Sequence, residues 1–165
     1  MRYEIKPKNL GKYEAKIARE LPKALEKARK TAATKAIAAL RNRIQTMDHP
    51  PLDRKRYLNG WRVTSPRWGA IALSNEWIHA QIIETGRAAK SARPPVTAIQ
   101  AWAVRKLGIP RKDAKRIAFV IARNIGERGL RGRHILFSMM PTISRIFLQE
   151  TGTCFEALLG PVGHS

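Results

Sequence analysis

The side chains that could perform hydrolytic or metal chemistry are few and widely spaced in this sequence. The four histidines (His49, His79, His134 and His164) occur singly, and there is no His-Glu-x-x-His run, paired-carboxylate spacing or Gly-x-x-x-x-Gly-Lys phosphate loop. A hydrolase needs a nucleophile beside a base, or a metal held by several His, Asp or Glu side chains. The sequence therefore predicts no enzyme, no metal site and no cofactor.

His79 and Glu84 are the one pair that an acid-base mechanism could use. They are five residues apart, so on a continuous strand they would point to opposite faces of the sheet. Cys154 is the single cysteine, which excludes an intramolecular disulfide and a multi-cysteine zinc site. We expect surface or packing roles for all three side chains.

Two segments rich in Gly and Arg are candidates for binding. No zinc-finger, homeodomain or RNA-recognition motif is present, so we expect contact with phosphates or an acidic partner without reading of bases. We also expect both segments to be loops whose backbone is not rigid, and loops that only connect elements remain the alternative. The candidate contact residues are Arg87, Lys90, Arg93, Arg128, Arg131 and Arg133.

The overall charge agrees with an anionic partner. The 165 residues include 32 Lys and Arg against 12 Asp and Glu, a formal charge of +20. Such a field attracts polyanions and opposes association between like faces. The cations occur along both halves of the chain, which favours folded basic surfaces over a charged tail, although a solvated face without a ligand is the alternative. At 44% hydrophobic residues we expect a folded body.

The tryptophans Trp61, Trp68, Trp77 and Trp102 suggest a base-stacking platform at first sight. Stacking aromatics should lie on one exposed face among basic residues. Trp102 instead lies on an apolar helix stripe, and Trp61 begins an alternating strand. Packing in the core or at a subunit interface is therefore predicted for Trp61, Trp77, Trp102, Ile117 and Ile121.

The N-terminal quarter of the chain is predicted to be helical. Residues 10–44 are mostly strong helix formers with Pro22 as the only breaker, which predicts a short helix, a kink at 21–22 and a longer helix from Pro22. The longer helix has one apolar stripe, which indicates core packing, with a partner-binding helix as the alternative. The stripe comprises Leu25, Ala28, Ala32, Ala36, Ala39, Leu40 and Ile44.

Strand patterns follow, and then helical ones. Residues 61–65 and 69–74 are predicted strands joined by a turn at Pro66, with residues 77–84 as a third strand. Apolar residues at helical spacing predict a helix from about Val96 that ends at Gly108. A second helix has the apolar face Ala114, Ile117, Ala118, Ile121 and Ile125, and Pro141 is expected to open a last helix.

Together these patterns predict an α+β protein, in which a long N-terminal helix packs on a small antiparallel sheet and two or three helices follow. The expected organisation is a helical arm over residues 1–45, a linker over 46–60, an α+β core over 61–150 and a C-terminal tail over 151–165, with 160–165 mobile. No stretch reaches the ~20 apolar residues of a membrane helix, and no signal peptide is evident. We therefore expect a soluble protein without a membrane partner.

Several unlike motifs follow one another in an order that resembles a virion protein family. The order is similar to that of the minor tail and tail-completion proteins at the head-tail junction of tailed bacteriophages, over about residues 57–149. The longer, more basic run at 87–93 departs from the family pattern. The motifs are Leu73-Ser74-Asn75-Glu76-Trp77-Ile78-His79-Ala80, Ile83-Glu84-Thr85-Gly86, Pro94-Pro95, Ala101-Trp102-Ala103-Val104-Arg105-Lys106-Leu107-Gly108, Ile117-Ala118-Phe119-Val120-Ile121-Ala122-Arg123 and Arg128-Gly129-Leu130-Arg131-Gly132-Arg133.

The resemblance implies a virion structural protein of the neck or upper tail, which acts in tail completion or head-tail joining. It implies assembly in the host bacterial cytoplasm into a homo-oligomeric ring, hexameric or larger, around the DNA channel. The partners would be further copies of the chain and neighbouring neck and tail proteins, with nonspecific contact to genomic DNA. A stand-alone nonspecific nucleic-acid-binding protein and a small phage-encoded nuclease are the alternatives.

Overall fold

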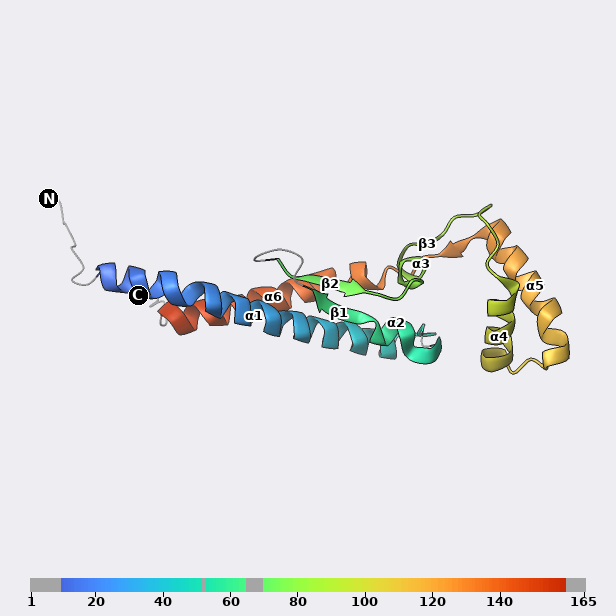
Figure 1. Cartoon of the computed structure of the whole chain (residues 1–165), viewed down its shortest axis with the longest axis horizontal. Helices are drawn as coiled ribbons and strands as arrows, with labels where there is room; N and C mark the ends of the chain where they lie inside the picture. Colours follow the sequence, from blue (N-terminus) through green and yellow to red (C-terminus); the bar gives the residue numbers. More distant parts are fainter. Residues whose placement is uncertain (1–9, 52, 65–69, 160–165) are drawn as a thin grey trace. The chain divides into compact units, whose positions relative to one another are not determined.

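The computed structural model describes residues 10–51, 53–64 and 70–159; the predicted Pro66 turn, Trp68 and the predicted mobile end lie outside them. The predicted α+β class is confirmed: a long N-terminal helix and a small antiparallel sheet are followed by further helices. Figure 1 shows the elements, which are α1 (Leu10–Thr46), η1 (Asp53–Lys55), α2 (Arg56–Asn59), β1 (Trp61–Thr64), β2 (Ala72–Asn75), α3 (Ala80–Thr85), β3 (Gly86–Arg87), α4 (Val96–Leu107), α5 (Arg111–Arg128), β4 (Leu130–Arg131) and α6 (Ile135–Leu159).

α1 is one helix of 37 residues with Pro22 inside it, so the prediction of two helices separated at 21–22 is wrong. Proline removes one backbone donor and leaves the carbonyl four residues earlier, that of Ala18, without its helical partner. Ala18 and Pro22 are both exposed, so water can bond to that carbonyl. The strong helix formers on both sides then carry the helix through the proline.

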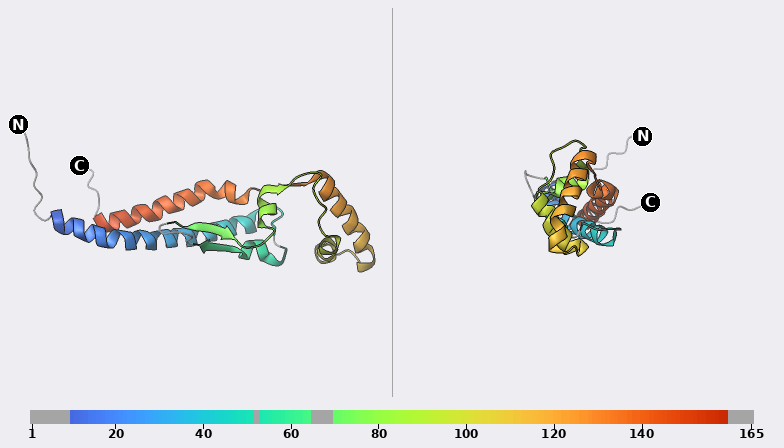
Figure 2. Two further views of the ribbon diagram at one scale, coloured as in Figure 1. Left: turned by 45° about the horizontal axis from the view of Figure 1, so that its top comes forward. Right: turned by 90° about the vertical axis from the view of Figure 1, so that its right-hand side faces the viewer.

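Among the described residues, the first of two compact units joins α1 up to residue 42, residues 62–64 and 70–74 of the β1–β2 sheet, and α6 from residue 139. α1 and α6 lie side by side in Figures 1 and 2, and the Lys35 ammonium is 2.5 Å from the Glu150 carboxylate. Small side chains in α1 allow close packing of neighbouring elements. The buried residues of this unit include Ala28, Ala32, Ala33, Ala36, Ile37, Leu40, Met139 and Ile143.

Two of the three predicted strands form. β1 and β2 pair in a two-stranded sheet. Residues 77–84, predicted as a third strand, instead lead into and form most of the short helix α3, and the Ile83 amide donates to the His79 carbonyl at 3.1 Å. A short apolar run fits a helix as well as a strand, because periodicity over so few residues does not distinguish them.

The second compact unit comprises residues 43–61 and 75–138. Its first stretch includes residues 53–59, which the sequence favoured as an exposed linker. These residues form η1 and α2 instead, and Tyr57 and Leu58 are buried. A polar, Pro-rich segment therefore contains one of the largest fully buried side chains of the described residues.

α4 and α5 form a helical hairpin, and both helices were predicted. Gly108 ends α4 in the left-handed conformation, with φ 64°, which glycine adopts at no steric cost. The buried residues Ala114, Ala118 and Ala122 recur every fourth position and so lie on one stripe of α5. Their size allows α4 and α5 to approach closely, and the predicted core residues Ile117 and Ile121 flank the stripe half-buried.

α6 begins at Ile135, six residues before the proline that was expected to open it. The Ser138 amide already donates to the His134 carbonyl at 2.9 Å, and Pro141 lies inside the helix. Pro141 leaves the Phe137 carbonyl without a helical donor. Because Phe137 and Pro141 are both exposed, that carbonyl can bond to water, and the helix continues.

Candidate functional site

The two predicted basic segments meet in the second unit. β3 pairs antiparallel with β4, with Gly86 opposite Arg131 and Arg87 opposite Leu130. Backbone hydrogen bonds extend the contact on both sides, from Arg133 to the Ile83 carbonyl at 2.8 Å and from Lys90 to the Glu127 carbonyl at 3.4 Å. We call residues 86–93 and 128–133 the basic strand pair. Most of residues 88–93 form a loop, as expected, whereas residues 86–87 and 130–131 form two short paired strands that the sequence did not indicate.

Glycines make this close approach possible. Gly86 and Gly129 have φ values of 82° and 75°, a region that side chains disfavour. A Cβ on Gly129 would lie 2.3 Å from the Arg87 carbonyl oxygen, and one on Gly132 would lie 2.4 Å from the Glu84 carbonyl oxygen. The glycines of the two motifs are therefore needed where the two backbones cross.

Two of the six predicted contact cations bind other parts of the chain. The Arg87 guanidinium donates through Nε to the Ser91 hydroxyl at 3.0 Å and through a second nitrogen to the Ala92 carbonyl. The Arg133 guanidinium donates to the His49 carbonyl. These side chains fix the loop over residues 87–92 and the segment around residue 49, so we assign them structural positions.

The other four predicted cations are exposed, and they are Lys90, Arg93, Arg128 and Arg131. The stem of Arg93 nevertheless packs on the chain, because a Cβ on Gly126 would lie 2.8 Å from its Cγ. Lys90, Arg128 and Arg131 thus present their charges on the basic strand pair. Exposed cations on a fixed backbone can bind phosphates or carboxylates without base specificity.

Glu84 precedes the basic strand pair and anchors it. Its carboxylate accepts a hydrogen bond from the Tyr57 hydroxyl and bonds from the Leu136 amide at 3.1 and 3.3 Å. Leu136 lies in the first turn of α6, where free N–H groups favour a negative charge. Burial of Tyr57, together with the bond to Glu84, raises the pKa of its hydroxyl above the usual range.

Aromatic rings surround Tyr57. Its ring lies edge-on to Trp61 at 5.7 Å and to Trp77 at 6.5 Å between centroids, and Trp77 lies edge-on to His79 at 5.2 Å. Trp61 is 3% exposed and so is buried within the chain. Trp77 and Trp102 are half-buried. His79 and Glu84 thus contact different groups: His79 packs against Trp77, and Glu84 accepts hydrogen bonds from Tyr57 and Leu136.

An ion pair ties η1 to α4. The Arg105 guanidinium contacts both oxygens of Asp53, at 2.7 and 3.1 Å. This hydrogen bonding lowers the pKa of Asp53 below its usual value. Bidentate geometry of this kind is among the stronger forms of carboxylate recognition.

The outer face of α5 carries an apolar patch that the sequence interpretation missed. Phe119 is 51% exposed and Val120 is 44% exposed. Arg116 and Arg123 lie three or four residues away on the same helix and are exposed. The pattern was visible in principle, since these four positions fall outside the predicted apolar face. A single aromatic ring does not make a stacking platform.

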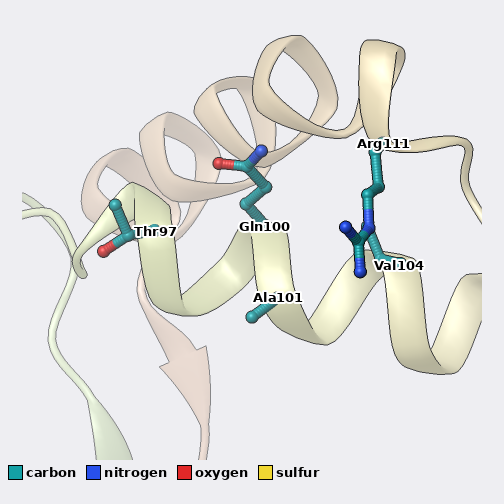
Figure 3. Close-up of a pocket in the computed structure, with 5 residues that line it drawn as sticks. All are labelled: Thr97, Gln100, Ala101, Val104 and Arg111. Carbon is teal, nitrogen blue, oxygen red and sulfur yellow. The ribbon is translucent and has the colours of Figure 1, made fainter.

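An open groove of about 430 Å³ lies along α4 at the start of α5 (Figure 3). Its lining residues are Thr97, Gln100, Ala101, Val104 and Arg111. The single cation stands beside two neutral polar side chains, and none of the five is a base that could activate the Thr97 hydroxyl.

Within residues 10–51, 53–64 and 70–159, no cluster of three or more His, Cys, Asp or Glu side chains is placed to hold a metal ion. Across the same residues, the helices are too short or too polar to cross a bilayer. Comparison of the chain with protein-family models, with curated proteins and with solved structures gave no match.

Proposed function

We propose that this chain is a structural protein of the neck or upper tail of a tailed-bacteriophage virion, where copies form a ring around the DNA channel and join head to tail. The order of motifs over residues 57–149 resembles that family. One observation carries the proposal: two of those motifs, 83–86 and 128–133, pair through backbone hydrogen bonds and glycine contacts. Two motifs that lie far apart in the sequence thus form one paired structure.

The chemistry of the basic strand pair supports this role. Lys90, Arg128 and Arg131 are exposed on paired backbone. Cations that face phosphates bind DNA of any sequence, which suits a channel through which a whole genome passes. The same cations also suit acidic surfaces of neighbouring neck or tail proteins.

The direct test is the mass of the purified protein by light scattering at moderate salt, with electron micrographs of the assembled species and of intact virions. We expect a closed ring, and a ring-shaped layer between capsid and tail that antibodies to the chain label. Absence of the chain from purified virions contradicts the proposal.

A second test uses the exposed cations. Replacing Lys90, Arg128 and Arg131 by Ala should leave the fold intact and reduce the yield of joined, DNA-containing particles. The matched control replaces Lys16, Lys23 and Lys27, three exposed lysines of α1, and removes the same charge. If the first variant is fully infectious, these three side chains are not needed for the proposed function.

The same cations favour one alternative, a stand-alone nonspecific nucleic-acid-binding protein. That function requires the isolated monomer to bind duplex DNA with an affinity that falls steeply as salt rises. In a plot of log affinity against log salt concentration, each phosphate contact adds roughly one unit to the downward slope. A stable ring with little affinity for DNA counts against it.

A further inference from the structure

α6 carries a second apolar stripe besides the one buried in the first unit. At 100° per residue, one side of the helix is formed by the residues that we call the α6 outer face. None of them is charged. They are Met140, Pro141, Ser144, Leu148, Thr151, Gly152 and Phe155.

The large side chains of this face are open to solvent. Leu148 is 73% exposed, Met140 is 47% exposed and Phe155 is 41% exposed, whereas Met139 and Ile143 on the opposite side of the helix are buried. A surface helix of a globular protein usually has one apolar stripe and a charged opposite face. The α6 outer face replaces that charged side with apolar and small residues.

Among the described helices longer than six residues, α6 alone has a negative formal charge. The helix has one basic and two acidic residues, a formal charge of −1, in a chain of +20. α1, with ten basic and three acidic residues, carries +7. Of the two acidic residues of α6, Glu150 is paired with Lys35 within the chain. Like charges oppose contact between copies over much of the surface, and the uncharged α6 outer face adds nothing to that opposition.

We propose that a second copy of this chain occupies the α6 outer face, as the neighbouring subunit of the ring; the ring itself rests on the proposed function. A nucleic acid is disfavoured there, because the face offers no cation. Gly152 carries no side chain on this face, and a Cβ added to it would meet no atom within 4 Å, so the space beside it is open. A side chain of a neighbouring subunit can approach the α6 backbone there.

Ring symmetry fixes the kind of contact. A closed ring of more than two copies needs a heterologous interface, in which the α6 outer face of one subunit meets a different surface of the next. Packing of two α6 outer faces against each other gives a closed dimer instead. The two arrangements differ in particle mass, so one measurement separates them.

The test is sedimentation velocity of the full chain at moderate salt, with circular dichroism as the check of folding. We expect wild-type particles larger than the monomer, and a shift of Leu148→Glu to the monomer mass with unchanged helicity. Phe119→Glu, at a 51% exposed position on α5, introduces the same charge and should assemble as wild type does. Gly152→Gln places a large side chain in the open space beside Gly152 without adding charge and should also weaken assembly.

The outcomes separate this inference from the proposed function. If wild type assembles and Leu148→Glu and Gly152→Gln assemble equally well, the α6 outer face is not the interface, while the ring remains. If wild type forms only a dimer that Leu148→Glu dissociates, the interface is supported and the ring is not. A wild-type monomer at all accessible concentrations overturns the self-contact.

Discussion

The Tyr57 hydroxyl donates a hydrogen bond to the Glu84 carboxylate, which also accepts the Leu136 amide. One carboxylate therefore joins α2, the end of α3 and the first turn of α6 within the second unit. The charge lies where a helix N-terminus stabilises it, and the buried phenol supplies a second donor to the half-buried carboxylate. Glu84 also lies directly before β3, so its contacts fix one end of the basic strand pair.

Replacing Tyr57 by Phe should lower the free energy of unfolding by about 1–2 kcal/mol, because one hydrogen bond to a charged group is lost. Glu84→Ala should cost more, about 2–4 kcal/mol, because it removes the acceptor from both Tyr57 and Leu136. Urea denaturation at neutral pH measures both changes. Equal stability of the two variants contradicts the shared role of the carboxylate.

Alkaline pH should destabilise the protein through Tyr57. The folded-state pKa of Tyr57 is raised above its usual value of 10.0. Above about pH 10 the unfolded state releases this proton and the folded state retains it, so stability falls as pH rises, by up to about 1.4 kcal/mol per unit. Lysines titrate nearby, so the diagnostic quantity is the stability difference between wild type and Tyr57→Phe. That difference should shrink above pH 10 and stay constant between pH 7 and 9.

The ion pair of Asp53 and Arg105 should make the stability of the protein depend on pH in the acidic range. The pKa of Asp53 is lowered in the folded state, so its contribution is present above its usual pKa and is lost as pH falls below about 4. Both side chains are about a third exposed, so Asp53→Asn should cost roughly 0.5–1 kcal/mol at pH 7. Denaturation at pH 7 and pH 2.5 should show the cost only at the higher pH.

Gly132→Ala should strongly destabilise the second unit. Its Cβ would lie 2.4 Å from the Glu84 carbonyl oxygen and 2.5 Å from the Thr85 carbonyl carbon, which are both backbone atoms and cannot turn aside. We expect a loss of at least ~2 kcal/mol, as for other backbone clashes. Loss of amide protection over residues 83–86 in hydrogen exchange would locate the effect.

Gly152→Ala is the matched control for that glycine. It lies inside α6, where an added Cβ meets nothing within 4 Å. Alanine should therefore stabilise the helix by roughly 0.5–1 kcal/mol, through its better helix propensity. In thermal unfolding, Gly132→Ala should lower the melting temperature and Gly152→Ala should raise it. Opposite shifts would show that the cost at Gly132 comes from the backbone clash and not from replacing glycine as such. A neutral Gly132→Ala variant contradicts the tight crossing.

α4 and α5 are predictable because their signals are local. Apolar residues at helical spacing run up to Gly108, which ends α4 in a left-handed conformation, and Pro110 immediately precedes α5. Pro22 and Pro141 misled the prediction for the opposite reason. Each is a strong local stop signal, but water at an exposed carbonyl and long flanking runs of apolar or helix-forming residues outweigh it.

The buried Tyr57 shows where local signals fail. Its neighbours include prolines and a run of three cations, a composition typical of an exposed linker. Its burial depends on Trp61, Trp77 and Glu84, whose positions follow from the tertiary fold and not from the segment itself. Composition could not place this residue in the core.

The cations of the candidate site were found by composition, but their arrangement was not. β3 and β4 are two residues long, so neither leaves a periodic pattern. Their partners lie more than 40 residues apart, and only the glycines hint that two backbones approach closely. The sequence gives no indication that Arg87 and Arg133 bind carbonyls while Lys90 and Arg131 face solvent.

The hydrogen bond from Lys90 to Glu127 means that the chain departs and returns at adjacent points. The segment between those residues, which contains α4 and nearly all of α5, is therefore an excursion whose two ends lie next to each other. The excursion is also held to η1 by the ion pair of Arg105 and Asp53. A hairpin of another length could therefore replace α4 and α5 with the flanking backbone unchanged, but only with the loss of that second attachment.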